Sequence, residues 1–102
     1  MIKPDQDLDK GLIGLHVLHH AAKKAVFGLW FLEELSHHGY KISPGTLYPL
    51  LHRLERKGYL RSSEERNGKQ MRRLYRATPL GRKILAIGKK QVRALFMELF
   101  EE

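Results

Sequence analysis

The 102-residue sequence contains no cysteine, which excludes disulfide stabilisation, thiolate catalysis and cysteine-based zinc sites. No apolar run approaches the roughly 18 residues that a membrane-spanning helix needs, and no N-terminal stretch has the apolar core of a signal peptide. No local Ser/His/Asp pattern indicates a hydrolytic centre. We therefore expect a cytoplasmic protein that is not an enzyme, holds no cofactor and has no membrane partner.

Acidic residues are scarce in the middle of the chain. Residues 41–83 hold twelve lysines and arginines but only three acids, a net charge of +9, whereas the rest of the chain carries −1. Such a concentration of positive charge indicates a polyanionic partner, although many small domains are cationic without binding nucleic acid. A hydrophobic content of 42% is normal for a globular domain, and the length favours a single domain spanning residues 1–102.

Apolar spacing and turn signals predict a mainly α protein with one small β-hairpin. Serine and threonine caps followed by proline mark two helix starts, at Ser43-Pro44 and at Thr78-Pro79. The dipeptide Asn67-Gly68 is a strong hairpin signal. After a lead-in over 1–7, the expected elements are helices over 8–22, 26–37 and 43–57, a hairpin over 59–78, and a last helix over 79–100.

The third predicted helix has an apolar back and a basic front. Leu47, Leu50, Leu51 and Leu54 follow the i, i+3, i+4, i+7 spacing of one buried stripe. The opposite face carries Thr46, Pro49, His52, Arg53 and Arg56, with Tyr48 on its flank. A surface helix with cations and hydrogen-bonding groups is what a DNA major groove accepts. An ordinary amphipathic helix with a solvated face has the same periodicity.

The run Ser-Pro-Gly-Thr-Leu-Tyr-Pro over residues 43–49, then Arg-Leu-Glu over 53–55 and Lys-Gly-Tyr-Leu over 57–60, resembles the recognition-helix signature of the PadR family of transcriptional regulators. Residues 68–81 resemble the wing, the second wing strand and the start of the last helix of that family. The resemblance covers roughly residues 8–100. It implies a winged helix-turn-helix in the order ααα-ββ-α, dimerisation through the C-terminal helix, and a function as a sequence-specific repressor.

Carried onto this chain, the resemblance and the charge pattern together suggest two sets of DNA-binding residues. The recognition helix would supply Ser43, Gly45, Thr46, Tyr48, His52 and Arg53, and the wing would supply Arg66, Asn67, Gly68, Lys69, Arg72 and Arg73. Whether His52 and Arg53 contact base edges or phosphates stays open. The alternative function is a winged-helix interaction or adaptor module that binds no DNA.

The last predicted helix is too apolar for one buried stripe, since its apolar residues spread over more than half its circumference. Two apolar faces imply two partners, the protein's own core and a second subunit related by a two-fold axis. The residues expected at that interface are Leu85, Val92, Leu95, Phe96, Leu99 and Phe100. A terminal helix wrapped by a larger core is the alternative.

Histidines and aromatic residues leave two further questions open. His16, His19 and His20 stand at i, i+3 and i+4 on the first helix, a chelating geometry that lacks a recognisable third ligand. Polar helix positions, some of them at the subunit interface, explain these histidines better, so we predict no metal site. Trp30, the only tryptophan, either packs in the core or lines a pocket for a small apolar effector. Multidrug-binding PadR proteins have a tryptophan on the last helix, and this chain has only Phe96 and Phe100 there.

Overall fold

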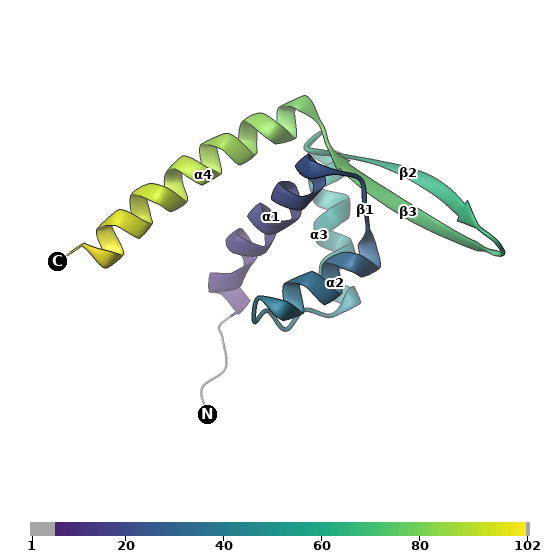
Figure 1. Cartoon of the computed structure of the whole chain (residues 1–102), viewed down its shortest axis with the longest axis horizontal. Helices are drawn as coiled ribbons and strands as arrows, with labels where there is room; N and C mark the ends of the chain where they lie inside the picture. Colours follow the sequence, from purple (N-terminus) through teal and green to yellow (C-terminus); the bar gives the residue numbers. More distant parts are fainter. Residues whose placement is uncertain (1–5, 102) are drawn as a thin grey trace.

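The computed structural model describes residues 6–101, and these form four helices and three strands (Figure 1). The elements in chain order are α1 (Gln6–Lys23), β1 (Val26–Phe27), α2 (Gly28–His37), α3 (Pro44–Arg56), β2 (Leu60–Asn67), β3 (Gln70–Ala77) and α4 (Pro79–Phe100). The predicted order of three helices, a hairpin and a last helix is confirmed. α1 begins at Gln6, inside the predicted lead-in, and residues 1–5 of that lead-in lie outside the described residues.

The predicted leucine stripe of α3 lies at the centre of the core. Leu47 and Leu51 are fully buried, Leu54 is nearly so, and Leu50 is half-buried against the same cluster. Apolar side chains from every other element pack around them: Ile13, Val17, Leu18, Ala21, Val26, Phe31, Leu35, Leu60, Tyr75 and Leu85. Burial of this face, at about 25 cal/mol per Å² of apolar surface, holds α3 with its opposite face outward.

The prediction of a helix over 26–37 is wrong at its first two residues. Val26 and Phe27 form the short strand β1, which pairs antiparallel with Tyr75 and Leu74 of β3. The sheet therefore has three strands in the order β1-β3-β2. A two-residue strand has no alternating pattern to detect, and the hydrogen-bond partners that make it extended lie almost fifty residues further along the chain.

The Asn67-Gly68 signal predicts the hairpin correctly, although Asn67 itself lies in β2. Asn67 pairs with Gln70 as the last residue of β2, so that the two-residue loop is Gly68-Lys69. Gly68 has a φ of +65°, and among the described residues no residue other than glycine has a positive φ. Glycine at the first loop position followed by a residue with negative φ is the pattern of a type II′ turn. Asn67 therefore contributes its side chain from a strand.

The start of α4 is fastened to the end of α3. Thr78 is the predicted N-cap, and its Oγ1 accepts a hydrogen bond from the Gly81 N–H at 2.9 Å. The same hydroxyl donates to the Gly58 carbonyl, and the Thr78 N–H donates to the Tyr59 carbonyl at 3.0 Å. A Cβ atom built on Gly81 would lie only 2.0 Å from that Tyr59 oxygen. Only glycine therefore allows the two backbones to lie this close.

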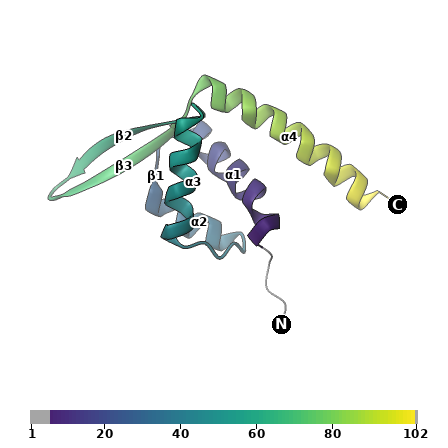
Figure 2. The ribbon, with the colours of Figure 1, turned by 180° about the vertical axis from the view of Figure 1, so that it is seen from behind.

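The hairpin and α4 extend from opposite sides of the helical body, as both views show (Figures 1 and 2). β1 pairs only with Tyr75 and Leu74, so the outer half of the hairpin has no third strand. On α4, Leu85 and Gly88 are the last buried residues, and residues 89–100 are all exposed. Over the described part of the chain, no helix is both long and apolar enough to span a membrane.

Replacing Gly81 by alanine should destabilise the protein, although alanine usually favours a helix. The added methyl group would collide with the Tyr59 backbone, and overpacking of this kind costs about 1–3 kcal/mol. Gly14→Ala on α1 is the matched control because its Cβ would meet nothing within 4 Å, so it should gain about 0.5–1 kcal/mol. Urea unfolding of both variants measures the difference, and equal effects would contradict the close contact.

Candidate nucleic-acid interface

The outward face of α3 is polar and basic. Thr46, Pro49, His52, Arg53 and Arg56 are all exposed, on the side opposite the buried leucines. The structure thus brings the predicted reading residues together on one surface, with Pro44 at the first helical position. Ser43, Gly45 and Thr46 extend this exposed surface to the N-terminal end of the helix.

Ser43 occupies the N-cap position of α3, but the expected capping bond is absent. Its side chain accepts no backbone N–H; its Oγ lies 3.3 Å from the Thr46 hydroxyl instead. The Ser43 carbonyl accepts the N–H groups of Thr46 and Leu47. The two hydroxyls, both exposed, leave the positive end of the helix dipole open to an anion such as a phosphate.

Tyr48 does not stand free on the flank of α3. It is half-buried, and its ring lies against the start of α2, where a Cβ on Gly28 would be 2.7 Å from Tyr48 Cε1. Tyr48 also lines a hollow of about 550 Å³ between α2, α3 and the outer half of β3, together with Phe27 and Trp30. Its ring is therefore fixed by α2, which the sequence did not reveal.

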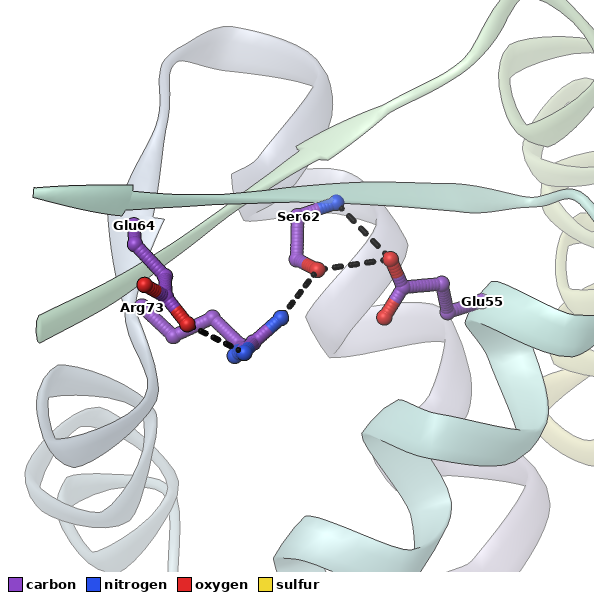
Figure 3. Close-up of polar contacts among 4 residues, drawn as sticks. All are labelled: Glu55, Ser62, Glu64 and Arg73. Carbon is purple, nitrogen blue, oxygen red and sulfur yellow. Dashed lines mark hydrogen bonds and ion pairs between the residues drawn. The ribbon is translucent and has the colours of Figure 1, made fainter.

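A chain of hydrogen bonds connects the end of α3 to the wing (Figure 3). The Glu55 carboxylate accepts from the Ser62 N–H at 3.1 Å and from the Ser62 hydroxyl at 2.6 Å. Arg73 then donates to the Ser62 Oγ at 3.0 Å and to the Glu64 carboxylate at 2.9 Å. None of these acceptors was among the predicted site residues, although Glu55 belongs to the Arg-Leu-Glu motif.

The two neighbouring arginines of the wing, Arg72 and Arg73, make different contacts. Arg73 lies beside Glu64, which offsets much of its charge, and it is held on the α3 side of the hairpin by Ser62. Arg72 comes from the opposite face of β3, and its guanidinium lies 5.0 Å from the centre of the Phe27 ring, a cation–π contact. The two arginines thus have different partners, the Phe27 ring for Arg72 and the Ser62 hydroxyl with the Glu64 carboxylate for Arg73.

The wing tip is far from α3. Arg66, Asn67, Gly68 and Lys69 are all exposed at the end of the hairpin, beyond the body of the molecule (Figures 1 and 2). The exposed cations of residues 53–76 run from α3 along both wing strands to this tip: Arg53, Arg56, Lys57, Arg61, Arg66, Lys69, Arg72, Arg73 and Arg76. The arrangement is a basic surface with a helix at one end and a thin hairpin at the other.

A second notable surface is the outer half of α4. Five of the predicted interface residues are exposed, from 41% for Val92 to 70% for Phe100, whereas Leu85 lies in the core of its own chain. The rings of Phe96 and Phe100 are 4.8 Å apart. Between α1 and α4 runs a largely apolar groove of about 490 Å³, whose walls include Leu12, Val92 and Phe96.

The histidines of α1 lie near the end of α2. His16 and His20 are joined there by His38 and Glu34, with His38 Nε2 3.2 Å from Glu34 Oε1. Within the part of the chain that the structure describes, no group of three or more histidines and acids is arranged to hold a metal ion.

Comparison with known proteins places this geometry among transcriptional regulators. A family model described as the transcriptional regulator PadR-like family matches residues 17–87, which include α2, α3 and the whole wing. The chain is similar to the transcriptional regulator Rv3488 of Mycobacterium tuberculosis, with 46% identity over 94 residues that cover 92% of this chain and 88% of the relative.

Solved structures have the same fold. A PadR family transcriptional regulator from Eggerthella lenta superposes with a TM-score of 0.81 at 31% identity, covering 91% of this chain and 82% of the other. A PadR-like transcriptional regulator from Bacillus cereus, at 22% identity, has a TM-score of 0.80 and covers 95% and 99% of the two chains. The latter likeness shows the fold alone.

Glu55→Gln should weaken the attachment of the wing to α3. The substitution keeps the shape of the side chain but removes the charge that strengthens both bonds to Ser62, which should cost about 1–3 kcal/mol of stability. Glu65→Gln, an exposed change on the same hairpin, should stay within about 0.5 kcal/mol. Urea unfolding tests both variants. If Glu55→Gln unfolds at the wild-type midpoint, the charge of Glu55 adds nothing to its bonds with Ser62.

Proposed function

The chain belongs to the PadR-like family of transcriptional regulators, and from this membership we propose that it represses transcription as a homodimer bound to a specific operator. That it is a DNA-binding transcriptional regulator, and not an enzyme, follows from the family and its relatives. The adaptor alternative is not favoured by these findings. The finer assignments below, of residues, subunits and mode of action, are proposals.

The observation that best supports the proposal is that α3 has one buried apolar face and one exposed basic face. Its leucines are buried and its basic face is free, so the helix can enter a major groove without disturbing the core. His52 and Arg53 lie on the exposed face, where they would contact base edges or phosphates. Ser43, Gly45 and Thr46 surround the N-terminal end of the helix and would hold a phosphate there.

Tyr48 would support this docking from the side, with its ring held by Gly28. The wing tip, formed by Arg66, Asn67, Gly68 and Lys69, would lie on the neighbouring backbone or in the minor groove. Arg72 would add a free charge and Arg73 would keep the hairpin at its angle to α3. Contacts of this kind to phosphates supply affinity that falls with salt because they release bound counterions.

The exposed apolar face of α4 would pack against the same face of a second subunit. A monomer of this size would otherwise expose Leu95, Phe96, Leu99 and Phe100 to water, each more than half exposed. A two-fold arrangement would present two α3 helices to two half-sites. The adjoining α1–α4 groove would take part of the partner helix. A small apolar effector would instead bind in the hollow lined by Trp30, Phe27 and Tyr48.

Paired titrations on operator and scrambled duplex test the role of α3. If Arg53 contacts a base, Arg53→Ala should cost about 1–3 kcal/mol on the operator and much less on the scrambled duplex. Lys69→Ala is the comparison, since a phosphate contact should weaken both duplexes alike and reduce the salt slope by about one. If Arg53, His52 and Tyr48 variants all keep the wild-type ratio of the two affinities, α3 does not read the operator.

Sedimentation tests the dimer. Phe96→Asp would place two unpaired charges in the α4 interface, and a buried uncompensated charge costs about 3–5 kcal/mol. The dimer dissociation constant should therefore rise by about 100-fold or more. Lys90→Asp is the matched control, on the opposite side of α4 by the helical repeat, and should leave the assembly unchanged. A folded wild-type monomer at micromolar concentration would disprove the dimer.

A further inference from the structure

Four histidines and one carboxylate gather where α1 meets the end of α2. Ring centres are 4.9 Å apart for His16 and His38, 6.3 Å for His16 and His20, and 4.9 Å for His19 and His20. Glu34 Oε1 lies 3.2 Å from His38 Nε2 and 3.9 Å from His20 Nε2. We call these five residues the histidine cluster.

The surroundings of the histidine cluster are aromatic and, on the α4 side, basic. The Tyr40 ring lies 5.3 Å from His16, and Trp30 lies 5.0 Å from His20. The charged groups that act on the imidazoles are Lys23 on α1 and Lys89 on α4, both of which oppose protonation, and Glu34 on α2, which favours it. Asp9 faces Tyr40 on the outer side, and Arg93 of α4 lines the groove that His16 and His19 also line.

One carboxylate cannot balance four imidazolium ions. A first proton gains an ion pair with Glu34, but each further proton adds a positive charge within a few ångströms of the first. Burial, together with the neighbouring positive charges, lowers the pKa of His16, His19 and His20 below the ordinary histidine value of 6.5. The packed histidine cluster is therefore more stable when these imidazole rings are neutral.

The histidine cluster lies between the two surfaces that operator binding would need. Glu34 and His38 end α2, which leads through a short turn into α3. His16 and His19 line the α1–α4 groove, and α1 fits so closely against α4 there that a Cβ on Gly88 would be 2.4 Å from Leu15 Cδ2. Movement of α1 would thus displace the helix-turn-helix relative to the dimer face.

We propose that the histidine cluster is a proton-sensitive joint whose protonation separates α1 from the end of α2 and from α4, so that acidification releases the operator. This inference rests on the proposed function, because it assumes that the dimer binds an operator. The packed state has histidines with lowered pKa values and binds fewer protons than a state in which α1 has moved away. Linkage therefore favours the packed state above the ordinary histidine pKa and disfavours it as the pH falls below that value.

Operator affinity measured from about pH 7.5 to about pH 5.5 at constant salt tests the joint. We expect the affinity of the wild type to fall by up to about tenfold per pH unit for each additional proton that the released state binds. A scrambled duplex should show no such fall, because added positive charge favours non-specific binding. Operator affinity that stays constant or rises with acid would overturn the proposal.

A double variant, His16→Gln with His20→Gln, removes two of the rings that charge and should flatten the pH profile of operator affinity. His37→Gln is the matched control, an exposed histidine beside His38 but outside the histidine cluster, and should keep the wild-type profile. A double variant with the full wild-type pH dependence, or a control that flattens it equally, would contradict the assignment.

If the double variant fails to fold, titration of the imidazoles in the wild-type protein by NMR still tests the proposal. His16 and His20 should change charge at a lower pH than free histidine, and titration at or above the free value would overturn the joint. The same measurement separates the two proposals. Absence of operator binding at every pH would refute the proposed function, whereas ordinary imidazole titration with intact operator binding would refute only the joint.

Discussion

The close contact between the Gly81 and Tyr59 backbones lies where the main parts of the molecule join. At the junction of Gly58 and Tyr59 with Thr78 and Gly81, the end of α3, both wing strands and the start of α4 all meet. α3, the wing and α4 therefore share one anchor. Because packed backbones resist deformation, the angle between α3, the hairpin and the exposed face of α4 is set at this point.

Around that anchor, residues of the same type make different polar contacts. Glu55 and Ser62 fasten the wing to α3 and fix Arg73, whereas Arg72 rests on Phe27 and stays available. Two adjacent arginines thus differ in their contacts because neighbouring residues of a strand point to opposite faces. A count of charges along the sequence does not distinguish Arg72 from Arg73. Only the residues that they contact do.

Local patterns predicted most of the fold. The leucine spacing of α3, the Thr78-Pro79 start of α4 and the glycine of the hairpin loop each act within a few residues, so they can be recognised in the sequence. Errors arose where distant segments decide. β1 exists because β3, almost fifty residues further along the chain, offers it hydrogen bonds.

The sequence by itself determined the family, the order of the elements, the apolar face of α3 and the position of the basic block, because these depend on periodicity and on short motifs. Tertiary structure decided which side chains are free to act. It packed Tyr48 onto Gly28, placed Leu85 in the core, and gathered His16 and His20 with Glu34 and His38. Such contacts join different elements, and their geometry follows from how the helices dock, which no local pattern encodes.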